Sequence, residues 1–187
     1  MMRLGVAVVS AMTFTASFNY VSDRENNSTR GLITTHKTVR AKTNLDDMIA
    51  AANNVFSNQI NVKMIKRNVR DVVIDRNVGD TIEYPDDWNL IASKGDKSAT
   101  LNVYFVRQLD DAAGAALYRT VMVQDELGEV RPEAVLAHEI GHFLGMPDEN
   151  RSDKANGFLM STGSRLRRNE MLAMRKVSAH ILKLTRN

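Results

Sequence analysis

Residues 131–148 read Arg-Pro-Glu-Ala-Val-Leu-Ala-His-Glu-Ile-Gly-His-Phe-Leu-Gly-Met-Pro-Asp. Pro132 suits the first position of a helix, where its missing N–H costs nothing. Glu133 favours the positive end of the helix dipole. Gly145 is a natural terminator, because glycine readily adopts the left-handed conformation that ends helices. Four residues between them supply apolar surface to bury, namely Val135, Leu136, Ile140 and Phe143. The segment therefore predicts a helix that begins near Pro132 and ends before Gly145.

This helix carries the motif His138-Glu139-Ile140-Gly141-His142. Positions i and i+4 lie on the same helix face, so both histidines can direct an imidazole at one ion. Zinc accepts such nitrogens at about 2.0–2.1 Å, and a catalytic zinc site keeps one position open for water. Glu139 follows the first histidine and can reach that water as a general base. The alternative is a pair of histidines with ordinary surface or core roles.

The residues after the helix extend the pattern. Asp148 follows His142 by six residues, so the chain can turn back after Gly145 and offer a third ligand. The order of these residues resembles the metzincin zinc endopeptidases, with Asp where most members have a third His. The snapalysin-like group of small bacterial metzincins is similar in this respect. The resemblance implies Zn²⁺ as cofactor, with His138, His142 and Asp148 as ligands and Glu139 as the catalytic residue.

A second segment strengthens the resemblance. Residues 157–161 read Gly-Phe-Leu-Met-Ser, and by resemblance Met160 is the methionine of the Met-turn beneath the zinc site. Ser161 and Thr162 follow it, so the tyrosine that some metzincin families place beside the zinc is absent there.

The third ligand has two further candidates. Asn169-Glu170 resembles the pair on the gluzincin zinc helix, where the glutamate is the third ligand, and Glu149 lies directly beside Asp148. Carboxylates bind zinc at about 2.0–2.2 Å, so chemistry does not choose among them. The spacing from Gly145 and the Met-turn favour Asp148.

The length and composition of the chain limit its domain number, its cysteine chemistry and its partners. At 187 residues the chain is predicted to be a single catalytic domain, with an N-terminal subdomain over residues 1–145 and a C-terminal subdomain over 146–187. There is no cysteine, which excludes disulfides and cysteine zinc ligands. The net charge of +3 is mild and does not indicate a nucleic-acid partner. No run of 18 apolar residues predicts a membrane span.

The N-terminal residues allow two interpretations. Residues 1–17 contain one arginine, an apolar run and small residues, a pattern found in signal peptides. Ser10, Thr13 and Thr15 interrupt the run, and its Val, Thr and Phe content favours a β-strand instead. The signal-peptide interpretation predicts a secreted or extracellular protein. A cytoplasmic location is the alternative.

The rest of the chain alternates strands and helices. Residues 45–58 predict a helix, because apolar residues recur there at helical spacing. Strands are predicted at 32–39, from 60 onward with a continuation or partner at 72–74, at 101–106, and over 115–124 as one strand or two. Residues 75–97 are predicted to be mainly loop with a short strand near 88–92. Residues 165–184 predict a long basic helix.

The resemblance implies an α+β metzincin-like zincin, in which a twisted, mixed and mostly parallel β-sheet accompanies the active-site helix, the Met-turn and a C-terminal helix. It also implies an antiparallel edge strand, which we place within residues 112–120. A protein or peptide substrate would bind there in extended form by β-augmentation.

The function predicted from these features is a zinc-dependent endopeptidase in which Glu139 activates a zinc-bound water. One alternative is a non-catalytic, zinc-containing peptide-binding module. Another is a gluzincin-type peptidase with Glu170 as third ligand. We expect a monomer.

Overall fold

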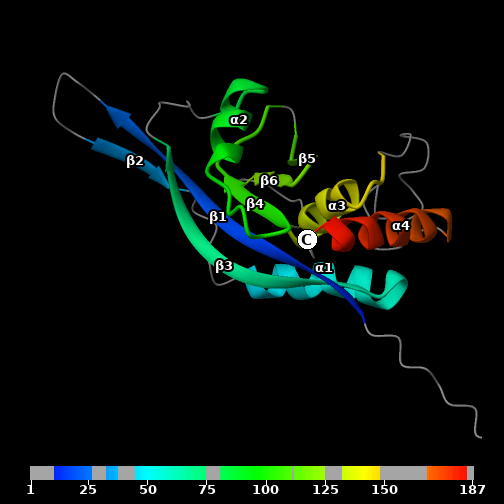
Figure 1. Ribbon diagram of the computed structural model, residues 1–187. Coiled ribbons are helices and arrows are strands. Elements are labelled where there is room, and N and C mark those ends of the chain that lie inside the picture. The colour runs from blue at the N-terminus through cyan, green and yellow to red at the C-terminus, as the bar shows by residue number, and fades with distance from the viewer. Residues whose placement is uncertain are drawn as a thin grey trace, which may run out of the picture.

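The computed structural model describes residues 11–26, 33–37, 45–74, 81–110, 112–124, 132–147 and 168–184. Strands and helices alternate along these residues (Figure 1). In chain order they are β1 (Met12–Asn26), β2 (Ile33–Lys37), α1 (Leu45–Ile60), β3 (Val62–Ile74), α2 (Asp86–Ser93), β4 (Leu101–Val106), β5 (Gly114–Leu117), β6 (Thr120–Gln124), α3 (Pro132–Phe143) and α4 (Arg168–Leu184).

In the described part of the chain the strands form one six-stranded sheet in the order β2-β1-β4-β6-β5, with β3 also paired to β1. The β1–β3, β1–β4 and β4–β6 pairs are parallel, whereas β1–β2 and β5–β6 are antiparallel. This confirms the predicted mostly parallel sheet. The antiparallel strand β5 lies at one end of it, inside the range predicted for the edge strand.

Strand β1 runs through the middle of the sheet. For residues 12–17 it distinguishes the two interpretations of the N-terminal segment, a signal peptide or a β-strand. These residues pair with β3 along one side and, from Ala16 onward, with β4 along the other. The strand interpretation is therefore confirmed for this part, whereas residues 1–10 lie outside the described residues. The cellular location stays a prediction.

Side-chain alternation along β1 gives the sheet two different faces. Phe14, Ala16, Phe18 and Tyr20 point into a core with residues of α1 and α3 and with Met174 of α4. A second core covers the opposite face and contains Trp88 and Ile91 of α2. Figure 1 shows α2 apart from α1, α3 and α4. Strand β4 is buried at every position because both of its faces are covered.

Helix α2 corrects one prediction, because residues 88–92 form part of a helix and not a strand. Asp86 and Asp87 lie in its first turn, where negative charge is favoured. Trp88 and Ile91, three residues apart, are its buried apolar residues. A single pair at this spacing is too short a pattern to separate a helix from a strand in the sequence.

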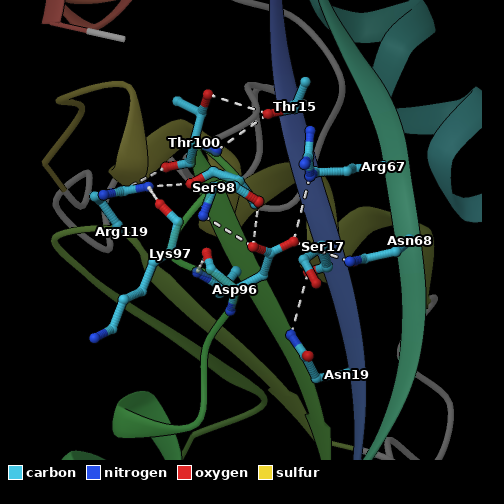
Figure 2. Close-up of polar contacts among 12 residues, drawn as sticks. Thr15, Ser17, Asn19, Arg67, Asn68, Asp96, Lys97, Ser98, Thr100 and Arg119 are labelled. Carbon is cyan, nitrogen blue, oxygen red and sulfur yellow. Dashed lines mark hydrogen bonds and ion pairs between the residues drawn. The ribbon is translucent and has the colours of Figure 1, made fainter.

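The face of the sheet near the end of α2 is polar. Figure 2 shows Asp96 joining the loop after α2 to β3. Its carboxylate accepts hydrogen bonds from the Ser98 hydroxyl, from the Ser98 backbone N–H at 2.8 Å and from Asn68 Nδ2 at 2.9 Å. Arg67 Nε lies 3.3 Å from the same carboxylate. Arg67 is the extra residue at a bulge, since Ala16 pairs with Lys66 and Ser17 with Asn68.

The same loop holds the turn between β5 and β6. Arg119 Nε donates to the Thr100 carbonyl at 3.1 Å, and its Nη2 donates to the Ala99 carbonyl (Figure 2). The Asn102 backbone N–H donates to the Arg119 carbonyl at 2.8 Å. Hydrogen bonds thus connect the turn that ends β5 to β4 and to the residues just before it. They give this short edge strand a fixed position.

Asp96→Asn is expected to destabilise the fold at neutral pH but not in strong acid. Hydrogen bonds from Ser98, first by side chain and then by backbone, lower the pKa of Asp96 from 3.8 to about 2. A folded-state pKa below the unfolded value means that stabilisation is present above the unfolded pKa and is lost as pH falls through the folded pKa. Urea unfolding of both proteins between pH 7 and pH 2 should show the gap in unfolding free energy closing below about pH 4. A gap that stays constant over this range would contradict the prediction.

Candidate active site

Helix α3 is held firmly against the core. Val135, Leu136, Ala137 and Ile140 are buried in the core shared with β1 and α1, and the Phe143 ring lies 5.6 Å from the Phe14 ring, centroid to centroid. The bounds of the helix, Pro132–Phe143, agree with the start and end predicted from Pro132 and Gly145. Its motif residues therefore project from a rigid element.

The two motif histidines converge. His138 Nε2 and His142 Nε2 lie 3.1 Å apart, and the ring planes are inclined by 83° with centroids 4.8 Å apart. Both side chains are half-buried. The i, i+4 spacing has thus brought two ring nitrogens to one point, as the sequence predicts.

The separation fits a shared zinc ion. Two nitrogens that each lie about 2.0–2.1 Å from one tetrahedral zinc are about 3.3–3.4 Å apart. The observed 3.1 Å differs from this by only a few tenths of an ångström. The donor set of two imidazoles therefore fits zinc without rearrangement of the helix.

The end of α3 fixes the orientation of His142. Gly145 has φ +91°, its N–H donates to the His142 carbonyl at 2.8 Å, and the Met146 N–H donates to the Gly141 carbonyl at 3.0 Å. This pair of bonds is a Schellman motif. The turn places the Met146 carbonyl 2.7 Å from His142 Nδ1. Because a carbonyl only accepts, Nδ1 donates, and the neutral ring keeps its lone pair on Nε2, the atom that faces His138.

Gly145→Ala is expected to weaken both the fold and zinc binding. An L-residue with left-handed geometry costs about 1–2 kcal/mol, and a Cβ here would lie 2.9 Å from Val177 Cγ2 of α4. Displacing the Met146 carbonyl removes an outer-shell partner, a change that costs about 10–100-fold in metal affinity. Competition with a chromogenic chelator measures the affinity, and urea unfolding measures the stability.

Val177→Ala in the same chain provides the control for this prediction. The double variant should recover the part of the stability loss that comes from crowding, and retain the part that comes from the left-handed backbone. An unchanged zinc affinity in a destabilised Gly145→Ala protein would show that the Met146 carbonyl does not orient the histidine.

Glu139 lies between the core and the edge strand. Its side chain is only 5% exposed, and β5 approaches it closely. A Cβ built on Gly114, the first residue of β5, would lie 2.7 Å from both Cγ and Oε1 of Glu139 and 2.8 Å from Val135 Cγ1. The absent side chain of Gly114 thus provides the space that the Glu139 carboxyl occupies, a contact that the sequence analysis missed.

A cavity of about 510 Å³ lies next to the same strand. Its lining includes Ala115, Ala116 and Leu117 of β5, together with Trp88 of α2, residues 82–84 and residues 109–110. Within the described residues β5 pairs only with β6, which makes it an edge strand of the described sheet. The motif helix, the edge strand and the cavity are therefore neighbours.

The remaining predicted residues are not brought to this site by the described part of the chain. Asp148, Glu149 and Met160 lie outside the described residues. Glu170 lies in the first turn of α4, and its side chain is likewise outside them. Among the described residues no third His, Cys, Asp or Glu joins the two histidines in a metal-binding group. The choice of third ligand stays a prediction.

Comparison with known proteins identifies the fold of the chain. The sequence matches no protein-family model. It also matches no curated protein. Among solved structures, mature mirolysin from Tannerella forsythia in complex with a cleaved peptide superposes with a TM-score of 0.62 at 11% identity, over 95% of this chain and 98% of that one. The fold is metzincin-like.

Two further structures are similar. A chaperone–substrate complex superposes with a TM-score of 0.54 at 16% identity, over 92% of this chain but only 35% of that one. Archaemetzincin from Methanopyrus kandleri has a TM-score of 0.49 at 13% identity, over 96% and 99% of the two chains.

Proposed function

We propose that the chain is a zinc-dependent endopeptidase whose metal is held by His138, His142 and Asp148. The observation that carries this proposal is the convergence of the two Nε2 atoms to 3.1 Å, on a helix whose Glu139 packs against an edge strand. The metzincin-like fold supports it, since mirolysin is a structure of the same fold that holds a cleaved peptide.

Each element has a role in hydrolysis. The free edge of β5 holds the substrate as an added strand by main-chain hydrogen bonds. His138, His142 and Asp148 would hold the zinc ion, which would supply charge to polarise the scissile carbonyl and to lower the pKa of a water toward about 7. Glu139 takes a proton from the water as the water oxygen bonds to the carbonyl carbon. It returns that proton to the amine nitrogen as the C–N bond breaks.

Peptide binding without hydrolysis is the second candidate function. The edge of β5 and the neighbouring cavity support binding as well as they support cleavage. What favours hydrolysis is Glu139, because a metal site with a purely structural role needs no carboxylate at this position.

Metal removal tests the proposal directly. We expect the purified protein to cleave an unfolded protein such as casein, to lose this activity completely in a zinc chelator, and to regain it when zinc is restored in excess. Fragment appearance on a gel measures cleavage, and mass spectrometry of the metal measures zinc content. If zinc-loaded protein cleaved neither casein nor a peptide library, the peptidase assignment would be overturned. Peptide binding without hydrolysis would then be the favoured function.

No helix among the described residues is long and apolar enough to cross a membrane.

A further inference from the structure

The cavity beside β5 lies where alternate side chains of an added strand would point. Gly114 faces Glu139 of α3, and Ala116 packs on the core shared with that helix. Ala115 and Leu117 point to the opposite face, against the core of α2. A peptide paired with β5 alternates in the same way. One set of its side chains therefore faces α3, and the other set faces α2, where the cavity is.

The cavity has an apolar interior. Ile82, Trp88 and Leu109 line it and are each less than a tenth exposed. The segments that carry them are tied together: the Ile82 N–H donates to the Gln108 carbonyl at 3.0 Å, and the Leu109 N–H donates to Gln124 Oε1 at 3.1 Å. The small side chain of Ala115 leaves the cavity beside it unfilled. The volume of about 510 Å³ lies within the roughly 300–1,000 Å³ of ligand pockets.

The rim of the cavity is negatively charged. Glu83 and Asp110 line it and are exposed, and none of its lining residues is a lysine or an arginine. This contrasts with the chain as a whole, whose net charge is +3. Tyr84, 71% exposed, adds an aromatic ring whose centroid lies 6.4 Å from that of Trp88. Two carboxylates and two aromatic rings that line one cavity suit one class of side chain.

We infer that this cavity is a specificity subsite for an arginine or lysine of the substrate, within about three residues of the cleaved bond. This inference rests on the proposed function for the position of that bond. The methylene stem lies along the apolar interior that Trp88 lines, and the cationic end meets the face of the exposed Tyr84 ring. The carboxylates of Glu83 and Asp110 accept its hydrogen bonds. The edge strand thus binds any extended sequence, and the cavity selects among them.

Trp88 provides a direct readout of occupancy, because it is the only tryptophan of the chain. The binding test uses zinc-loaded protein carrying Glu139→Gln, with peptides that contain no tryptophan or tyrosine. One peptide has a single arginine, and its partner has norleucine in the same place. We expect saturable changes in tryptophan fluorescence, with at least tenfold tighter binding of the arginine peptide. The Glu83→Gln, Asp110→Asn double variant should reduce this preference to less than twofold.

The cleavage test measures kcat/KM for the same peptide pair with the wild-type protein, the arginine being moved in turn through three positions on each side of the bond. We expect at least a tenfold preference for arginine at one position, and a fall of this preference to less than twofold in the double variant. Asp86→Asn, an exposed carboxylate of α2 that does not line the cavity, is the matched control and should keep the preference.

The two tests separate the subsite from the peptidase assignment. Tighter binding of the arginine peptide in the fluorescence test, without cleavage of any peptide, would support the subsite and overturn the hydrolytic function. Cleavage with no arginine preference in either test would overturn the subsite and leave the peptidase. A preference that survives Glu83→Gln, Asp110→Asn would also overturn it, since the selection would then come from another part of the chain.

Discussion

Replacing Glu139 with glutamine is expected to lower kcat for peptide hydrolysis by about 10²–10⁴-fold, the range that a positioned general base contributes. Glutamine has nearly the same shape and fits the same space between Val135 and Gly114. It cannot take a proton from water at neutral pH. The folded structure and the two histidines should be unaffected, so the zinc content and the unfolding midpoint should match those of the wild type.

Glu139→Asp provides a graded comparison. The carboxylate is retained but withdrawn by one methylene, and a displacement of about 1 Å from the reacting atoms costs about 100-fold. We therefore expect aspartate to give measurable activity between those of glutamate and glutamine. If the glutamine variant cleaved peptides at the wild-type rate with normal zinc content, proton transfer would have to come from another group.

The local features around the motif are predictable from the sequence because they depend on neighbours along the chain. Helix α3 is specified by residues within one segment, and the left-handed Gly145 ends it as expected. The two histidines meet because helix geometry alone brings i and i+4 together. The antiparallel edge strand followed from the family resemblance, and β5 lies within the range predicted for it.

The features that give the candidate site its shape depend on contacts between distant segments. The approach of Gly114 to Glu139 depends on how β5 packs on α3, and no local pattern encodes it. The cavity combines residues near Ile82, Leu109 and Ala115, which lie in separate segments. Helix α2 was missed because the polar composition of residues 75–97 indicated a loop with a short strand near 88–92. Acidic residues such as Asp86 and Asp87 are also typical of a helix N-terminus.

Gly114→Ala is expected to lower kcat by about 10–100-fold while zinc remains bound. The added methyl group would lie 2.7 Å from Glu139 Cγ and Oε1 and 2.8 Å from Val135 Cγ1, closer than carbon and oxygen atoms pack. Val135 belongs to the buried core and yields little, so the Glu139 side chain or β5 must shift. A shift of about 1 Å at the Glu139 carboxylate, the proposed general base, is enough for a loss of this size.

A second crowded glycine, whose Cβ would not meet Glu139, tests whether this loss is specific. A Cβ on Gly95 would lie 2.8 Å from Tyr104 Oη, so Gly95→Ala should destabilise the fold by overpacking, by about 1–3 kcal/mol. At a similar stability, and below the unfolding transition, we expect Gly95→Ala to lose less kcat than Gly114→Ala, because its Cβ meets Tyr104 and Asn102 and not Glu139. In the Glu139→Asp background, where the shorter side chain leaves room for a methyl group, Gly114→Ala should cost less than it does alone. Equal kcat losses for the two glycine variants would show that the contact between Gly114 and Glu139 has no positioning role.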